Sequence, residues 1–191
     1  SDSDFYQLLA PNVNQYNGIM GQLITLEGVF DDKGKPVLDK KTKEPKVPGD
    51  PQWLLFEKCI RGDTSDNIFS AFPGARKKGT KNKIGMLEAF EDKEKQGFNW
   101  NNFMLQRWVD HDNVEHRVLE DYNRNKMLID LTAQPDEIKQ VLDGKIVEQV
   151  QKQRKGQVGI QFMKFCGKWD LQRTSERAQD HAEYLNAAYG D

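Results

Sequence analysis

Two pairs of aspartates are spaced closely enough for their carboxylates to act together. Asp2 and Asp4 lie at the start of the sequence, and Asp63 and Asp66 belong to the run Gly-Asp-Thr-Ser-Asp-Asn at 62–67. Residues two apart in an extended segment share a face, and so do residues three apart at the start of a helix. Four carboxylates brought together would repel one another unless a cation lay among them. Oxygen ligands of this kind favour Mg²⁺ or Mn²⁺, so the pattern predicts a divalent-metal site.

The alternative interpretation is that each aspartate pair is only a solvated cap. A basic segment nearby favours the metal site instead. Between Asp66 and Glu88 there is no acidic residue, although the net charge of the whole chain is −2. Segment 74–83, called the basic loop below, holds the side chains Arg76, Lys77, Lys78, Lys81 and Lys83. This local concentration predicts contact with a polyanion, whereas a solubilising surface is the other possibility.

The smaller residues of the basic loop support contact with phosphate. Thr80 and Lys81 lie at the start of a predicted helix over 80–91, where free backbone N–H groups favour an anion. Gly74 and Gly79 would let the backbone approach a bulky polyanion closely. Contacts of this kind grip the sugar–phosphate backbone and carry little sequence information. A metal beside such a loop indicates phosphate chemistry, because the metal polarises a phosphoryl oxygen and lowers the pKa of a bound water.

The elements that must position these residues are mostly helices. Asp50 followed by Pro51 predicts a helix that runs to Gly62 and carries Asp63 at its end. Residues 19–30 read as strand, with a turn at 31–36 and a possible return at Val37 and Leu38. Further short or amphipathic helices are predicted over 64–70 and 80–91, through Trp100, Phe103, Met104 and Trp108, through Val114, Val118 and Tyr122, from Pro135 to Val150, and from Thr174 or Ser175 onward. The fold class is therefore predominantly α with a small β element.

Composition excludes several classes of protein. The 191 residues include 37% hydrophobic and 30% charged side chains, a length and composition that suit one domain, with or without a small appendage. The longest apolar run, 53–56, is far short of a bilayer span, so no membrane partner and a cytoplasmic location are expected. Cys59 and Cys166 are too few for a disulfide framework, and Cys59 is predicted to be a core residue. His111 and His116 are expected on different helix faces, which argues against a zinc site.

Several motifs in this order resemble those of the 5′-nucleases, the flap-endonuclease-like enzymes. The run Ser-Asp-Ser-Asp-Phe-Tyr-Gln-Leu-Leu at 1–9 is similar to their strand-end motif. Asp-Pro-Gln-Trp at 50–53 and Gly-Asp-Thr-Ser-Asp-Asn at 62–67 resemble the segment that enters their helix–three-turn–helix motif. Segments 122–125 and 128–131 are similar to a later stretch of the phage members. The resemblance covers residues 1 to about 140 and is nearest to the T-even-like phage ribonuclease H type, a 5′→3′ exonuclease.

The resemblance implies a site, a fold and an activity. Asp2, Asp4, Asp63 and Asp66 would hold the second Mg²⁺ or Mn²⁺ of a two-metal site, and the basic loop would grip duplex DNA. The implied fold is the C-terminal helical part of a PIN-like α/β nuclease, with regions 1–49 (nuclease core), 50–95 (helix–three-turn–helix) and 96–191 (C-terminal helices). The implied activity is metal-dependent hydrolysis of phosphodiesters near the 5′ ends of RNA–DNA or flapped DNA duplexes in replication, with replication proteins as further partners.

The sequence departs from the family pattern in two places. The family's Gly-Ile-Gly turn, whose carbonyls bind K⁺, is replaced by the longer and more basic segment 73–79, which argues against a bound K⁺. The family's sheet and its other acidic ligands are expected upstream, so the chain is interpreted as a C-terminal portion that is inactive in isolation. The expected location is the cytoplasm, which is that of the host if the protein is phage-encoded. Two alternatives are a non-catalytic branched-DNA binding module and a haloacid-dehalogenase-like phosphatase, which also has an Asp-x-Asp pair.

Overall fold

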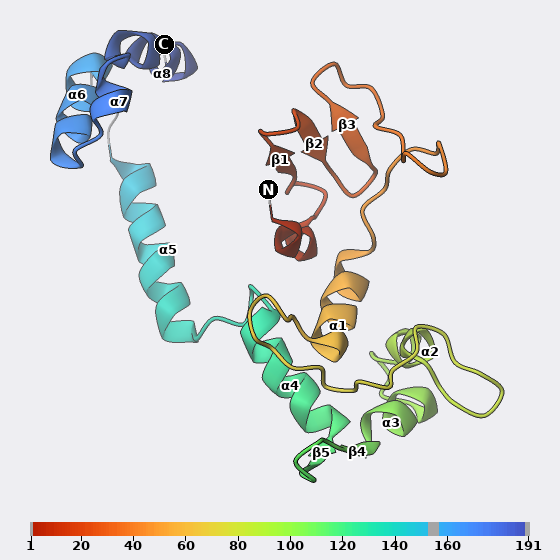
Figure 1. Ribbon diagram of the computed structural model, residues 1–191. Helices are drawn as coiled ribbons and strands as arrows, with labels where there is room; N and C mark the ends of the chain where they lie inside the picture. Colours follow the sequence, from red (N-terminus) through yellow and green to blue (C-terminus); the bar gives the residue numbers. More distant parts are fainter. Residues whose placement is uncertain (1, 153–156, 190–191) are drawn as a thin grey trace. The chain divides into compact units, whose positions relative to one another are not determined.

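The protein is predominantly helical with a small antiparallel sheet, as the sequence predicts. The computed structural model describes residues 2–152 and 157–189 (Figure 1). The chain divides into two compact units, one before Asp136 and one from Asp136 onward. None of the described helices combines the length and the apolar character that crossing a membrane requires.

The first unit opens with a short 3-10 helix and a three-stranded sheet. Helix η1 spans Ser3–Leu8, and the strands β1 (Gln15–Asn17), β2 (Gln22–Ile24) and β3 (Val29–Asp31) pair antiparallel in that order. The predicted strand over 19–30 is thus two strands. They are separated by a tight turn in which the Thr25 backbone N–H donates to the Gly28 carbonyl oxygen over 2.9 Å.

This sheet region has a small core of its own. Leu9, Ile24 and Val29 are buried together, with Tyr6 and Val37 packed against them. The predicted return at residue 37 is confirmed, because the Val37 backbone N–H donates to the Val29 carbonyl oxygen over 2.8 Å. The core ties η1 to the sheet, and η1 in turn contacts the following helix.

Helix α1, Pro51–Arg61, confirms the predicted helix after Asp50. The Asp50 carboxylate accepts a hydrogen bond from the Gln52 backbone N–H over 2.8 Å, and Pro51 occupies the first turn, where its missing N–H costs nothing. The apolar side chains of α1 face the main core: Trp53, Phe56, Cys59 and Ile60 are all buried. Gly62 ends the helix at a positive φ of 76°.

The main core joins α1 to three later helices. They are α2 (Met86–Glu91), α3 (Phe98–Met104) and α4 (Val118–Ile129). The Phe56 ring lies at its centre, 5.4 Å from the Phe90 ring, 6.1 Å from that of Trp100 and 5.7 Å from that of Tyr122. One core therefore continues across residue 95, where the sequence placed a boundary between regions.

A β-hairpin replaces part of two predicted helices. Strands β4 (Arg107–Val109) and β5 (Glu115–Arg117) pair antiparallel, so Trp108 is not on the helix of Trp100, and Val114 lies in the turn before β5. The spacing of Trp108 mimics a helical period, but the turn at 110–114 reverses the chain. It does so through the Asp110 carboxylate, which accepts from the Val114 N–H over 2.9 Å, and through Asn113 at a φ of 60°.

The second unit contains α5 (Asp136–Gln151), α6 (Val158–Lys168), α7 (Gln172–Ser175) and α8 (Ala178–Tyr189). The predicted helix after Pro135 is confirmed as α5. Around the start predicted at Thr174 or Ser175, α7 ends and α8 begins three residues later. Helices α6 and α8 pack together around buried Cys166 and Ala182.

Candidate metal centre

Three of the four predicted acidic ligands lie together. Asp4 on η1 and the pair Asp63 and Asp66 after α1 each offer a carboxylate oxygen, and these oxygens all lie within 4.8 Å of one another. Asp4 is brought to the others by the contact between η1 and α1. The structure therefore joins two parts of the sequence that the sheet and a long loop separate, as the sequence analysis expected.

A tight turn, and not a helix, presents Asp63 and Asp66. The Asp63 N–H donates to the Ile68 carbonyl oxygen over 2.8 Å, and the Ile68 N–H donates back to the Asp63 carbonyl oxygen over 2.7 Å. The helix predicted over 64–70 is therefore wrong. Two backbone conformations explain why: Gly62 has a φ of 76° and Asn67 a φ of 57°, and neither continues an α-helix. We call residues 63–68 the acidic turn.

Asp2 does not belong to the carboxylate group. The prediction placed Asp2 and Asp4 on one face of an extended segment, but residues 3–8 form η1. Asp2 is the N-cap of that helix, and its carboxylate accepts from the Asp4 backbone N–H over 3.0 Å. Because a capping carboxylate is held at the helix start, Asp2 positions Asp4 while its own oxygens lie outside the group.

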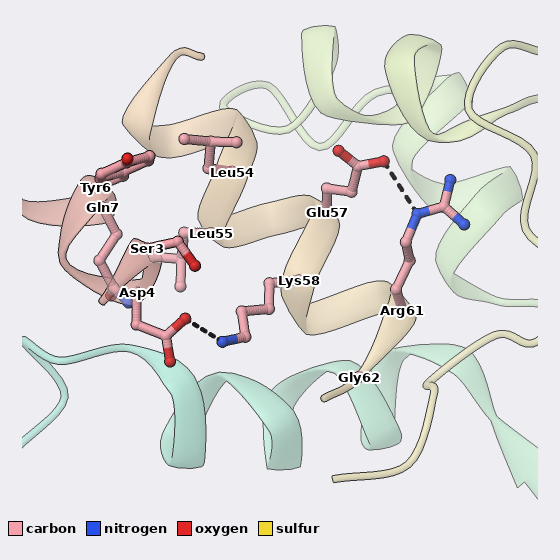
Figure 2. Close-up of a pocket in the computed structure, with 10 residues that line it drawn as sticks. All are labelled: Ser3, Asp4, Tyr6, Gln7, Leu54, Leu55, Glu57, Lys58, Arg61 and Gly62. Carbon is pink, nitrogen blue, oxygen red and sulfur yellow. Dashed lines mark hydrogen bonds and ion pairs between the residues drawn. The ribbon is translucent and has the colours of Figure 1, made fainter. Parts of the chain in front are cut away.

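A lysine from α1 lies among the acidic side chains. The Lys58 ammonium donates a hydrogen bond to the Asp4 carboxylate (Figure 2). It also forms an ion pair with Asp63 over 2.6 Å. Burial alone would lower the pKa of Lys58, but its hydrogen bonds to Asp4 and Asp63 outweigh burial and raise that pKa. The same contact with Lys58, aided by Ser65, lowers the pKa of the Asp63 carboxyl. Both groups are therefore charged at neutral pH.

No sequence pattern identified Lys58, because a single charged residue in an amphipathic helix is usually expected to face solvent. Its side chain is nevertheless only 24% exposed, and that of Asp63 only 13% exposed. The signal available in the sequence was its position one turn before the Gly-Asp run, on the helix that ends there. Lys58 therefore pairs with two of the three clustered carboxylates.

A cavity of about 290 Å³ adjoins this group between η1 and α1. Figure 2 shows Asp4 and Lys58 meeting across it, with the ion pair of Glu57 and Arg61 further along α1. Its walls are of mixed character, with apolar contributions from Tyr6, Leu54 and Leu55 and polar ones from Ser3, Asp4, Gln7 and Lys58. Of the three carboxylates, Asp4 therefore borders an open space and is not sealed within the core.

The cationic side chains of the basic loop are exposed, but the N–H groups of Gly79, Thr80 and Lys83 are already hydrogen-bonded within the protein. Arg76, Lys77, Lys78, Lys81 and Lys83 are all exposed. Thr80 is not a helix N-cap, since it pairs with Lys83 in a short turn and α2 begins only at Met86. The Glu88 carboxylate accepts hydrogen bonds from the N–H groups of Gly79, over 2.9 Å, and Gly85, over 3.0 Å. The predicted placement of Thr80 and Lys81 at a helix N-terminus is therefore wrong, and the Gly79 N–H already has a partner.

Two further predictions concern cysteine and histidine. Cys59 is fully buried, as predicted, and burial raises the pKa of its thiol to about 12, so it stays protonated at neutral pH. His111 and His116 do not lie on a helix, because both belong to the hairpin segment β4–β5. Among the described residues, the one cluster suited to a metal contains only carboxylates and no histidine.

No family model, curated protein or solved structure matches this chain. The geometry of the site is therefore the basis for its chemistry. Three carboxylates with neighbouring oxygens form a donor set of the kind that hard divalent cations prefer. Asp63 and Asp66 come from one short turn and Asp4 from a separate helix, so the set depends on tertiary structure.

Proposed function

We propose that this chain supplies part of the metal site of a 5′-nuclease that hydrolyses phosphodiesters near the 5′ ends of flapped or RNA–DNA duplexes. The observation that carries the proposal is the convergence of Asp4, Asp63 and Asp66. The exposed basic loop supports it, because clustered lysines and arginines attract a phosphate backbone. The resemblance of residues 1–9 and 62–67 to the 5′-nuclease motifs supplies the reaction class.

In this proposal Asp4, Asp63 and Asp66 hold Mg²⁺ or Mn²⁺. When bound, the cation supplies charge neutralisation at the phosphate and a lowered pKa for a bound water. The protein's own residues would do the remaining work. Lys58 must give up its contacts with Asp4 and Asp63 as the cation enters, and its ammonium is then free to meet an anionic oxygen beside the cavity. The basic loop would hold the duplex through its phosphates.

Titration with Mn²⁺, followed by electron paramagnetic resonance of the free ion, tests the metal site. The folded protein is expected to bind Mn²⁺, and Mg²⁺ is expected to compete. Asp63→Asn, which keeps the side-chain shape and removes the charge, is expected to weaken Mn²⁺ binding by at least about tenfold. Asp112→Asn in the exposed hairpin turn is the matched control and should leave the affinity unchanged. Absence of Mn²⁺ binding by the folded wild-type protein would contradict the proposal.

A non-catalytic branched-DNA binding module is the second candidate function. The observation that favours it is Lys58, whose ammonium pairs with both Asp4 and Asp63 without any metal. In that case the affinity for a 5′-flap duplex, measured by fluorescence anisotropy, should survive Asp63→Asn and Asp66→Asn. It should still fall steeply with salt, and Lys81→Ala with Lys83→Ala should weaken it and reduce the salt dependence. Nuclease activity that persists after Asp63→Asn would show that Asp63 is not part of the catalytic site, and would favour the binding module.

A further inference from the structure

The described part of the chain holds one fully buried amide side chain, Asn125 on α4, with an exposed fraction of 0%. Its Nδ2 donates to the Cys59 carbonyl oxygen over 2.9 Å and to the Phe69 carbonyl oxygen over 2.7 Å. A buried polar side chain is costly unless its hydrogen bonds are made, and here both amide hydrogens have partners. The two acceptors lie far from Asn125 in the sequence, so the contact is a tertiary one.

The orientation of this amide is set by its neighbour. Arg124 donates to Asn125 Oδ1 through Nε over 3.2 Å and Nη2 over 3.0 Å. Because a guanidinium can only donate hydrogen bonds, the oxygen of Asn125 must face Arg124 and its nitrogen must face the two carbonyls. Arg124 is itself held by Asp121, whose Oδ1 accepts from Nη1 over 2.6 Å.

The two carbonyls lie on either side of the acidic turn. Cys59 is in the last turn of α1, where carbonyl oxygens have no partner within the helix. Phe69 directly follows Ile68, which closes the turn. Asn125 therefore ties the chain entering the acidic turn to the chain leaving it. Residues 64–67 of the turn are exposed. The ends of the turn are held by the two Asp63–Ile68 hydrogen bonds, by the Ala71 N–H, which donates to the Ile60 carbonyl oxygen over 2.9 Å, and by the two contacts of Asn125.

From this geometry we infer that Asn125 is a positioning residue that holds Asp63 and Asp66 in place for the cation; the inference rests on the proposed metal site. Without the Nδ2 donors, the buried Cys59 carbonyl oxygen and the partly buried Phe69 carbonyl oxygen would lose their side-chain partner, and the Asp63–Ile68 hydrogen bonds would lose support. Loss of a group that hydrogen-bonds a metal ligand directly typically lowers metal affinity about 10- to 100-fold, and a displaced turn that carries two of the ligands is expected to cost at least the lower end of that range.

The test compares Asn125→Leu with Val118→Ala, a cavity-forming control at a buried position of the same helix. The first readout is amide hydrogen exchange at Asp63 and Ile68, whose N–H groups form the turn's hydrogen bonds. The second is Mn²⁺ affinity. Asn125→Leu is expected to accelerate exchange at these two amides beyond its effect on α3 and to weaken Mn²⁺ binding at least tenfold. Val118→Ala should accelerate exchange evenly and keep the affinity of the wild type.

Arg124→Met provides a second variant in case Asn125→Leu fails to fold. The Arg124 side chain is 47% exposed, so little burial is lost, but the amide of Asn125 is no longer oriented. It should accelerate exchange at the same two amides to a smaller degree. Equal exchange at Asp63 and Ile68 in a folded Asn125 or Arg124 variant and in Val118→Ala would overturn the inference. If the wild type bound no Mn²⁺, the proposed function would fail, whereas the exchange comparison would still decide the role of Asn125.

Discussion

Lys58 sets the charge of the acidic group at the scale of single residues. Lys58 forms ion pairs with both Asp4 and Asp63. A metal ion that enters the group therefore competes with an ammonium that is already there. Competition of this kind makes the apparent metal affinity smaller than the carboxylates alone would provide.

Replacing Lys58 with Met is expected to raise the affinity for Mn²⁺ about tenfold, because an adjacent opposite charge shifts a carboxyl pKa by 1–3 units and that interaction no longer has to be broken. In the absence of metal, the pKa of Asp63 should rise toward its ordinary value, which an NMR titration can follow. Lys93→Met is the control, since its side chain has the same 24% exposure and does not contact these acids. Weaker Mn²⁺ binding by Lys58→Met would identify Lys58 as a supporting group of the site.

At the scale of elements, the acidic turn depends on the glycine that precedes it. Gly62 combines a φ of 76° with a ψ of −172°, a region that is accessible almost only to glycine. A Cβ atom there would lie 2.4 Å from the Ile68 carbonyl oxygen. Helix α1 could not pass into the acidic turn along the same path with a side chain at this position.

Gly62→Ala is therefore expected to lower the free energy of unfolding by about 2–3 kcal/mol and to weaken Mn²⁺ binding. Urea denaturation provides the measurement. Gly34→Ala is the matched control, because Gly34 has a similar φ of 72° but no atom within 4 Å of an added Cβ. The control should show the backbone cost alone. Equal losses in the two variants would show that the close approach to Ile68 has no energetic consequence.

The hairpin β4–β5 is attached to α4 through His116. Its Nδ1 lies 3.0 Å from the Asp121 carboxylate and its Nε2 3.0 Å from that of Asp110. The imidazole also stacks on Trp108 with a centroid distance of 4.4 Å, and the other charged group in contact with this set is Arg124, through Asp121. Only a protonated imidazole can donate to both carboxylates at once.

The pKa of His116 is raised, mainly by its hydrogen bond to Asp110 and further by Asp121, against the opposing effect of burial. A raised folded-state pKa means that this stabilisation is fully present below the unfolded value of about 6.5 and is lost as pH rises through the folded value. The melting temperature of the wild type should therefore fall as the pH rises from about 6.5 through the folded-state pKa of His116. His116→Gln should remove the decline, whereas His111→Gln, at a side chain that is 89% exposed, should not. An unchanged pH profile in His116→Gln would refute this assignment.

At the scale of the whole molecule, local signals in the sequence predict local structure. The Asp50–Pro51 start and the Gly62 end predicted α1 correctly because capping, proline geometry and glycine conformation act within a few residues. The hairpin was missed because Trp108 repeats at a spacing that suits a helix. Its actual environment includes a hydrogen bond from Nε1 to the Ala71 carbonyl oxygen over 2.9 Å, a partner that no nearby residue reveals.

The candidate site shows the same contrast between features that local sequence predicts and features that depend on tertiary contacts. The sequence identified Asp4, Asp63 and Asp66 by residue type and spacing, but the exclusion of Asp2 depends on the hydrogen bond that makes it a helix cap. The roles of Lys58 and Asn125 depend on how η1 and α4 pack against α1. Such contacts arise only when the elements are assembled, so no spacing rule within one element could have predicted them.

Glu88 determines which groups of the basic loop remain available for contact. Its carboxylate accepts hydrogen bonds from the Gly79 and Gly85 N–H groups at the two ends of the loop. The N–H groups of the next two residues, Met86 and Leu87, donate to the carbonyl oxygens of Arg76 and Lys77. The exposed side chains of Arg76, Lys77, Lys78, Lys81 and Lys83 are therefore the main groups that the basic loop presents to solvent. If the loop binds a polyanion as proposed, contacts from such side chains would respond to charge density and carry little sequence information.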